Sequence, residues 1–555
     1  MMSMPPARRG FVRRQLRAPY AAVVGALVGF WLSLTPSLMP RAAGAQALIS
    51  AVCACAGYGL GALVGWLVRR CGVRPVGRAR RAAWWVLAVV GGIGCIVALW
   101  LGLRWENEVR RLVGVDRVGL LHVLVSVALT AVLAVVLLLV ARAVKAVGRV
   151  AGRLIATVMP AVAATLLGGL IAAVAAYVLV VDVGGGRLVG ALDATFRTLN
   201  DEFRTDLPKP TSPDVSAGPR SGQSWNELGR QGRLFVVNTP TAEQVSAFTG
   251  EPSLHPVRAY IGAGADGVDL EAEARRAVTE LEALGGFDRA VLNVATGTGR
   301  GWVNENQAQA LEYMWGGDTA TVSMQYSYLP SWMSFLLDGD RAQDAGRTLF
   351  DAVYAHWQGL QPAHRPLLVV SGESLGSFGG EAAFSDAHDL ATRTSGALFV
   401  GPTANNVLWS RFTSHRDPGT PQVLPVLDRG ATVRFADVPA DWERPGPWTG
   451  VRIGYLQHAN DPITWWSWEL AVRRPDWLEE PPGRGVSPHL HWIPGVTMLQ
   501  LGVDQFAANS VPDGEGHEFG QSPAYAWAKI LPPARWTDAD TAALAELLRS
   551  NPAPR

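Results

Sequence analysis

Five long apolar runs in the first third of the chain constrain its fold more than any other feature. They cover residues 19–40, 42–68, 82–103, 118–141 and 154–181. Each has at least about 20 residues, which at a helical rise of ~1.5 Å is enough to cross the ~30 Å hydrocarbon core of a bilayer. None contains Asp, Glu, Lys or Arg, and His122 is the only titratable imidazole in them. The runs predict five membrane-spanning helices, with four or six left open because the last run is long and contains Pro160.

The basic residues between these runs predict how the helices cross the membrane. Residues 1–18, 69–81 and 142–153 together carry fifteen Lys and Arg, whereas the opposite set of connections carries five, at position 41 and within 104–117. Because cytoplasmic loops hold the excess of positive charge, we expect a cytoplasmic N-terminus and everything after about residue 184 to lie outside the cytoplasmic membrane. A cleaved signal peptide ending near Ala47 is the alternative for the first run, and it leaves the C-terminal half outside as well.

A change of composition after the last run predicts the domain boundaries. We expect a transmembrane domain over 1–184, a surface helix and Pro/Gly/Ser-rich linker over 185–232, and an exported domain over 233–550. The exported half has no cysteine, since Cys53, Cys55, Cys71 and Cys95 all lie in or beside the apolar runs, so it folds without disulfides. The net charge of +2 gives no electrostatic support for a nucleic-acid partner.

The exported half alternates short apolar runs with helix-compatible segments. The expected helices include Leu270–Leu284, Asn304–Met314 and Asp340–Leu360. The expected strands are Leu234–Asn238, Val257–Ile261, Ala290–Ala295, Thr321–Gln325, Pro366–Ser371, Ala397–Val400 and Val451–Gln457. Fully apolar strands separated by helices predict a doubly wound, mostly parallel sheet covered on both faces. Functional side chains in such sheets gather at the C-terminal ends of the strands.

A Gly-Glu-Ser-Leu-Gly pentapeptide, residues 372–376, follows one of these expected strands and opens into a small-residue segment. That order predicts a strand, a sharp turn and a helix, with Ser374 at the apex. Glycines on both sides let the backbone bend tightly and leave the hydroxyl exposed to a base. The pattern favours Ser374 as a nucleophile, although the pentapeptide alone also occurs by chance.

A serine hydroxyl needs an imidazole to take its proton and a carboxylate to orient that imidazole. Asp461 follows the expected strand 451–457 and directly precedes a proline. His517 lies near the end of the chain in the glycine-flanked loop 513–520, where it could swing onto the serine. Each also has a purely structural alternative, as a turn cap and as a surface loop residue. The rival acids are Asp504 and Asp513; the weaker histidines are His388, His458, His489 and His491, the last two also a weak zinc-site candidate.

The oxyanion of such a reaction needs two backbone donors. We expect the N–H of Leu375, which follows the serine, and an N–H from the loop after strand 290–295, at Gly297 or Thr298. A nucleotide-binding interpretation of that glycine-rich loop is weaker, because its spacing is G-x-G-x-G and no ribose-binding acid follows it. We expect no cofactor and no metal.

Aromatic side chains crowd after two strand ends and are candidates for substrate binding. Trp465 and Trp466 follow Asp461, and Trp332 follows the strand 321–325. They could be core, the cap of an acyl pocket, or anchors in the headgroup layer. With the domain attached to a membrane, a lipid or other acyl ester is the expected substrate.

Taken together, these motifs resemble the α/β-hydrolase fold superfamily, and more narrowly a bacterial family of membrane-anchored α/β-hydrolases typical of actinobacteria. The matching stretches are residues 33–41, 229–236, 296–299, 372–376, 455–462 and 516–517, and they extend over nearly the whole chain. The resemblance implies Ser374, Asp461 and His517 as a catalytic triad, and it names no substrate.

Four functions follow from these observations. The first is a membrane-anchored serine esterase or lipase acting through an acyl-enzyme, and the second is an acyltransferase that passes the same acyl group to an alcohol. The third is a transporter with an accessory domain, which the lack of charge in the apolar runs disfavours. The fourth is a non-catalytic binding module on a hydrolase fold.

Overall fold

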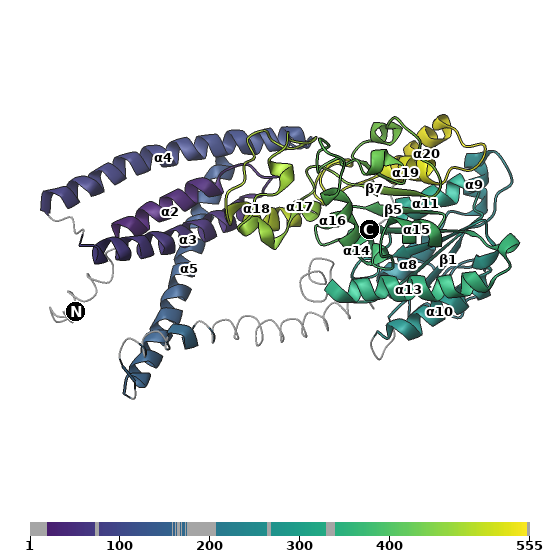
Figure 1. Cartoon of the computed structure of the whole chain (residues 1–555), viewed down its shortest axis with the longest axis horizontal. Helices are drawn as coiled ribbons and strands as arrows, with labels where there is room; N and C mark the ends of the chain where they lie inside the picture. Colours follow the sequence, from purple (N-terminus) through teal and green to yellow (C-terminus); the bar gives the residue numbers. More distant parts are fainter. Residues whose placement is uncertain are drawn as a thin grey trace. The chain divides into compact units, whose positions relative to one another are not determined.

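The computed structural model describes residues 19–72, 77–157, 159–160, 207–263, 268–328 and 339–551, with scattered positions between 163 and 174. The chain forms two compact units (Figure 1). The helical unit comprises residues up to 186 together with 468–478 and 485–507, and the α/β unit comprises 187–467, 479–484 and 508–555. An apolar helical region followed by an α/β region is the predicted fold class.

The helical unit is built from the apolar runs. Its helices are α2 (Tyr20–Ser33), α3 (Ala43–Arg70), α4 (Gly77–Leu112), α5 (Leu120–Ile155) and α18 (Val496–Asp504). Among the described residues, α3, α4 and α5 are long and apolar enough to cross a membrane, and α2 is a shorter apolar helix. More than half of the fifth predicted span, 154–181, lies outside the described residues, and residues 185–206, where the surface helix was predicted to begin, lie wholly outside them.

The helix boundaries differ from the predicted spans in two respects. The first run was expected to be helical to residue 40, but α2 ends at Ser33. Pro36 and Pro40 account for this difference, since the residue before a proline is disfavoured in the helical region and a proline has no N–H to donate. Conversely, α5 continues to Ile155, so the basic residues 142–153 lie on the helix and not in a separate loop.

Residues from late in the chain complete the helical unit, which the apolar runs alone do not predict. Helix α18 packs against α2 and α3. Val503 contacts Ile49 and Cys53 in a small apolar cluster.

The α/β unit contains a seven-stranded sheet in which every pairing is parallel, as predicted. The strands are β1 (Val257–Ile261), β2 (Val291–Thr296), β3 (Thr319–Met324), β4 (Leu367–Glu373), β5 (Gly396–Val400), β6 (Val433–Ala436) and β7 (Arg452–Leu456). Their order in the sheet is β1-β3-β2-β4-β5-β7-β6. Nearly all strand residues are buried, as a sheet covered on both faces requires.

Helices cover both faces of this sheet (Figure 1). The helices of the unit are α8 (Gly229–Val237), α9 (Ala242–Thr249), α10 (Leu270–Leu284), α11 (Glu305–Met314), α13 (Gly339–Gly359), α14 (Leu375–Glu381), α15 (Ala387–Arg393), α16 (Val407–Ser414), α17 (Pro462–Trp465), α19 (Ser522–Ile530) and α20 (Asp538–Ser550). Helices α10, α13 and α14 pack together on one face, and α9, α11, α19 and α20 form the group on the other.

Most predicted elements of this unit are confirmed, and one is wrong. The expected strand Leu234–Asn238 belongs to helix α8. A short apolar run has no periodicity that separates a buried strand from a buried helix turn. The helix packs so closely on β1 that a Cβ at Gly232 would lie 2.4 Å from the ring of Tyr260. The four-residue edge strand β6 was not predicted.

The strand order changes direction between β2 and β4. From β2 the chain moves outward through β3 toward one edge, and from β4 it continues toward the other. In open parallel sheets, ligands bind beyond the carboxyl ends of strands at such a switch point. The loops that follow β2, β4, β5 and β7 are therefore the place to look for a functional site.

Candidate functional site

Ser374 lies in the sharp turn between β4 and α14. Its φ of 56° and ψ of −121° are unusual for a residue with a side chain, and holding such a conformation costs on the order of 1–3 kcal/mol. Its backbone N–H donates to the carbonyl of Val400 at the end of β5 (2.9 Å). A residue kept in a strained conformation by surrounding structure is a frequent feature of reactive sites.

The two glycines of the pentapeptide are required by close backbone packing. A Cβ at Gly372 would lie 2.2 Å from the carbonyl oxygen of Gly376, and a Cβ at Gly376 would lie 2.2 Å from the carbonyl oxygen of Thr296. The turn is therefore packed against itself and against the end of β2. The loop after β2 reaches the serine turn, as the sequence led us to expect.

Asp461 and His517 are brought together from loops 56 positions apart. The Nδ1 of His517 lies 2.6 Å from the Oδ2 of Asp461. Asp461 caps α17, since its carboxylate also accepts hydrogen bonds from the N–H of Ile463 (2.8 Å) and the hydroxyl of Thr464 (3.1 Å). With all three donors on one fully buried carboxylate, the imidazole is fixed in one orientation.

The imidazole of His517 lies near Ser374. A Cβ at Gly401 would lie 2.4 Å from Cε1 of His517, and Gly401 directly follows Val400, which accepts the Ser374 N–H. Nε2 of His517 is buried and has no hydrogen-bond partner among the described residues, so Ser374 Oγ does not donate to it in this structure. Such bonds are often long in unliganded enzymes and tighten when substrate binds.

The electrostatic surroundings favour a basic imidazole. Burial alone would lower the pKa of His517, but the Asp461 carboxylate and its hydrogen bond, with a smaller contribution from Glu373, raise the pKa above its ordinary value. Glu373 itself accepts a hydrogen bond from the side chain of Asn304. A raised pKa makes the imidazole a stronger proton acceptor.

The loop that carries His517 makes hydrogen bonds to neighbouring segments. The side chain of Asn460 accepts from the N–H of Gly516 (3.0 Å), and the N–H of His517 donates to the carbonyl of Ala508 (2.9 Å). His458 Nδ1 lies 2.8 Å from the carbonyl of Gly516, and its ring stacks on Phe519. These hydrogen bonds connect the loop of His517 to the segment that follows β7.

Sequence reasoning missed this role of His458. Burial lowers the pKa of His458 to about 4, so its ring is neutral near pH 7 and its Nδ1 donates to the Gly516 carbonyl. Its position three residues before Asp461 in the segment 455–462 was the available signal. His458 therefore positions the loop of His517.

The rival acids and one of the weaker histidines have other surroundings. Asp504 lies in the helical unit, where it pairs with Arg41, and Asp513 lies against Gly520. His489 is more than half exposed. No cluster of three His, Cys, Asp or Glu side chains suited to a metal occurs within the described ranges.

The predicted oxyanion donors have different surroundings. Leu375 is the first residue of α14, and the first N–H groups of a helix have no partner within that helix. The N–H of Thr298 already donates to the carbonyl of Trp302 (2.8 Å), so it is committed to its own turn. Gly297 remains the donor expected from that loop.

The aromatic residues after β7 are buried. Trp465 is 3% and Trp466 is 8% exposed. The indole N–H of Trp465 donates to the carbonyl of His458 (3.0 Å), and its ring packs edge-on against Trp409. These contacts support the core alternative for Trp465. Trp332 lies outside the described residues.

Comparison with protein families agrees with the observed fold. A model described as an alpha/beta-hydrolase family matches residues 257–544, which is more than half of the chain. The chain belongs to this alpha/beta-hydrolase family. A second model, described as the N-terminus of an alpha/beta-hydrolase family, matches residues 34–240 and so includes the apolar helices α3, α4 and α5. No curated protein and no solved structure matches it.

Proposed function

We propose that this alpha/beta-hydrolase family member is a serine hydrolase that cleaves esters, with a membrane lipid as substrate, at the outer face of the cytoplasmic membrane. The observation that carries the proposal is the arrangement around the Val400–Gly401 peptide. The carbonyl of Val400 accepts a hydrogen bond from the N–H of Ser374, and Gly401 lies against the ring of His517. The Nδ1 of that ring is hydrogen-bonded to Asp461.

The reaction would proceed through an acyl-enzyme. Ser374 Oγ attacks the ester carbonyl while Nε2 of His517 takes the hydroxyl proton, and Asp461 stabilises the imidazolium that forms. The N–H groups of Leu375 and Gly297 would bind the oxyanion. His517 then protonates the leaving alcohol, and an activated water releases the acid. An alcohol in place of water would make the same acyl-enzyme a transferase intermediate.

A fluorophosphonate probe tests the nucleophile without knowledge of the substrate. We would label membranes containing the full chain as wild type, Ser374→Ala, His517→Ala and Ser385→Ala; Ser385 is an exposed serine outside the site. Labelling should be lost in Ser374→Ala, strongly slowed in His517→Ala and unchanged in Ser385→Ala. Equal labelling of wild type and Ser374→Ala, or none of well-folded wild type, would contradict the proposal.

A further inference from the structure

The helical unit contains a cavity at one end of its helices. Its empty volume is about 590 Å³, which includes the solvent space at its open side. The cavity lies where α2 and α4 end and where α3 and α5 begin, because its lining comes from residues 30–50, 99–109 and 122–130. Helices that alternate in direction bring these four ends together.

The lining of the cavity includes both apolar and polar side chains. Phe30, Leu99, Leu103 and Val127 are among the apolar ones, on three different helices. Arg41, Ser37 and Ser126 are among the polar ones. A cavity with this lining fits an amphiphile, with a chain against the apolar side chains and a polar group near Arg41.

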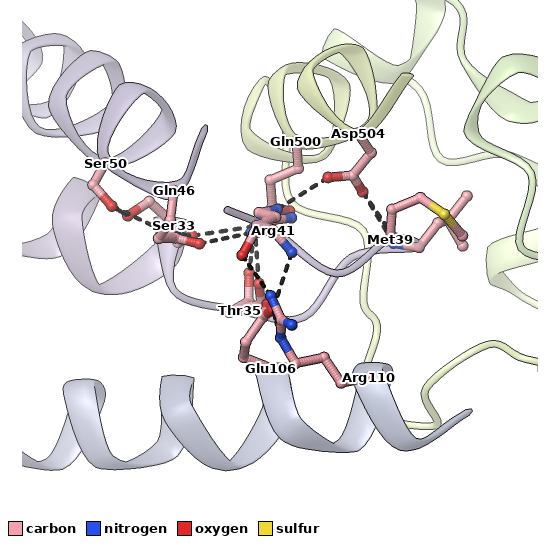
Figure 2. Close-up of polar contacts among 11 residues, drawn as sticks. Ser33, Thr35, Met39, Arg41, Gln46, Ser50, Glu106, Arg110, Gln500 and Asp504 are labelled. Atoms are coloured by element: carbon pink, nitrogen blue, oxygen red, sulfur yellow. Dashed lines mark hydrogen bonds and ion pairs between the residues drawn. The ribbon is translucent and has the colours of Figure 1, made fainter. Parts of the chain in front are cut away.

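The guanidinium of Arg41 is held by hydrogen bonds (Figure 2), but one of its nitrogens has no acceptor among the described residues. Its Nε donates to Asp504 Oδ1 (3.0 Å) and its Nη1 donates to Gln46 Oε1 (3.0 Å). The residue is only 4% exposed, and its Nη2 has no hydrogen-bond partner among the described residues. The hydroxyl of Ser37, which lines the same cavity, is also buried without a partner in that part of the chain.

The two buried donors without a partner indicate which kind of ligand atom would bind in the cavity. A buried donor without an acceptor costs roughly 1–3 kcal/mol, so an oxygen acceptor placed near Arg41 Nη2 and Ser37 Oγ would be stabilised there. The cavity therefore favours a ligand with an acceptor oxygen.

The charges around the cavity favour an acceptor without a full negative charge. Arg41 pairs with Asp504, and Arg110 pairs with Glu106 (2.7 Å). Glu106 also accepts from the backbone N–H of Arg41, and Arg110 donates to the backbone carbonyl of Arg41 (Figure 2). Two cations and two anions already balance, so a phosphate would add an unpaired charge in a partly buried site. An ester carbonyl or hydroxyl would add none.

We propose that this cavity binds a single-chain acyl ester lipid of the monoacylglycerol type. Its ester oxygens accept hydrogen bonds from Arg41 Nη2 and Ser37 Oγ, and its acyl chain lies against the apolar side chains of α2, α4 and α5. The site uses no residue assigned to catalysis, so it stands whether or not Ser374 is a nucleophile.

The test uses a monoacylglycerol whose acyl chain carries a photoreactive diazirine and an alkyne, added to the full chain in nanodiscs. The Ser374→Ala form is used throughout so that the probe is not consumed. Cross-linked peptides are mapped by mass spectrometry in this background before any further substitution. We expect cross-links within 30–41, 99–109 and 122–130; cross-links spread evenly over the exposed faces of α4 and α5 would overturn the proposal.

A matched pair of substitutions on α5 provides the control. Val127→Trp fills the cavity, whereas Val135→Trp places the same side chain at a position that is 56% exposed and outside the cavity. Since overpacking costs about 1–3 kcal/mol, cross-linking in the cavity should fall about tenfold in Val127→Trp and stay unchanged in Val135→Trp. Equal labelling of the two variants would overturn the proposal.

A photoreactive fatty acid of the same chain length separates the two sources of an acceptor oxygen. The balanced charges predict that the neutral monoacylglycerol competes better than the fatty-acid anion for the mapped peptides. Preferential labelling by the anion would overturn the assignment to a neutral ester lipid.

Discussion

At the scale of single residues, the contact between Asp461 and His517 determines what the site can do. The carboxylate fixes Nδ1, which leaves Nε2 as the only ring nitrogen that can accept a proton from Ser374. The same carboxylate raises the pKa of His517 against the opposing effect of burial. Orientation and basicity therefore depend on one side chain.

The raised pKa has a predictable effect on the pH profile. His517 must be neutral to act as a base, so activity falls as the pH drops through its pKa, and the acidic limb of kcat/KM should lie above the value of ~6.5 of an unperturbed histidine. Asp461→Asn should lower activity by about 10⁴-fold and move the acidic limb of the residual activity to lower pH. A pH–rate series with a chromogenic ester measures both effects; a limb that stays in place or moves to higher pH would contradict the assignment.

The residues of the site differ in how far the sequence revealed them. Ser374 was a candidate because of its flanking glycines, and Asp461 because of its position at a strand end. The role of His458 was not evident, because a buried histidine that binds a backbone carbonyl has no sequence pattern that distinguishes it from any other. Thr298 was expected to donate to the oxyanion, but its N–H donates to the carbonyl of Trp302. That hydrogen bond depends on a turn that the sequence does not specify.

At the scale of elements, the backbones at the ends of β2 and β4 and at the start of α14 pack closely together at glycines. Gly376 touches Thr296, and Gly372 touches Gly376, through backbone atoms that cannot turn aside as a side chain can. The strained conformation of Ser374 is maintained by this packing. Activity and stability should therefore respond together to changes at these glycines.

Gly376→Ala tests that coupling. Its methyl group would lie 2.2 Å from the Thr296 carbonyl oxygen, so the backbone must shift, at a cost of about 1–3 kcal/mol, and labelling of Ser374 should decline. Gly359→Ala is the matched control, because a Cβ there meets nothing within 4 Å and its effect should stay within about 0.5 kcal/mol. Thermal melts with fluorophosphonate labelling at a permissive temperature measure both; equal behaviour of the two variants would refute the packing argument.

Element predictions succeeded where a pattern was long and failed where it was short. Leu270–Leu284 shows helical periodicity over four turns and forms α10 with those bounds. Leu234–Asn238 offered only a short apolar run, and residues 234–237 form the last turn of α8 instead. Tertiary packing, which no local pattern contains, decides such short segments.

At the scale of the whole chain, one buried carboxylate joins residues from opposite ends of the sequence. Asp504 accepts hydrogen bonds from Arg41 and from the N–H groups of Leu38 and Met39. Apolar runs predict helices but not their late partners, so this link could not be predicted from sequence. Through this contact the helical unit depends on a residue that lies 463 positions after Arg41 in the chain.

Asp504→Ala should therefore destabilise the helical unit. It leaves the Arg41 guanidinium buried without its counter-ion, at a cost of about 3–5 kcal/mol. Asp344→Ala is the control, since Asp344 is 58% exposed and pairs with an exposed arginine, an interaction worth about 0–1 kcal/mol. Limited proteolysis of the full chain in nanodiscs should release fragments of α2 and α3 in the first variant only; the same protection in both would disprove the link.

The direction in which the helices cross the membrane is the remaining property of the whole molecule. The excess of basic residues in 1–18, 69–81 and 142–153 predicts that Cys71, an exposed cysteine in the described chain after α3, lies in the cytoplasm. An impermeant maleimide should therefore label Cys71 in spheroplasts only after permeabilisation. In a Cys71→Ser background, Arg117→Cys, between α4 and α5, should be labelled without permeabilisation, and Cys71→Ser alone gives the background from the less exposed cysteines. The charge pattern implies two crossings between residue 117 and the α/β unit, so both lie on the same side of the membrane. The opposite labelling pattern would therefore place Ser374 in the cytoplasm and rule out a substrate from the outer leaflet.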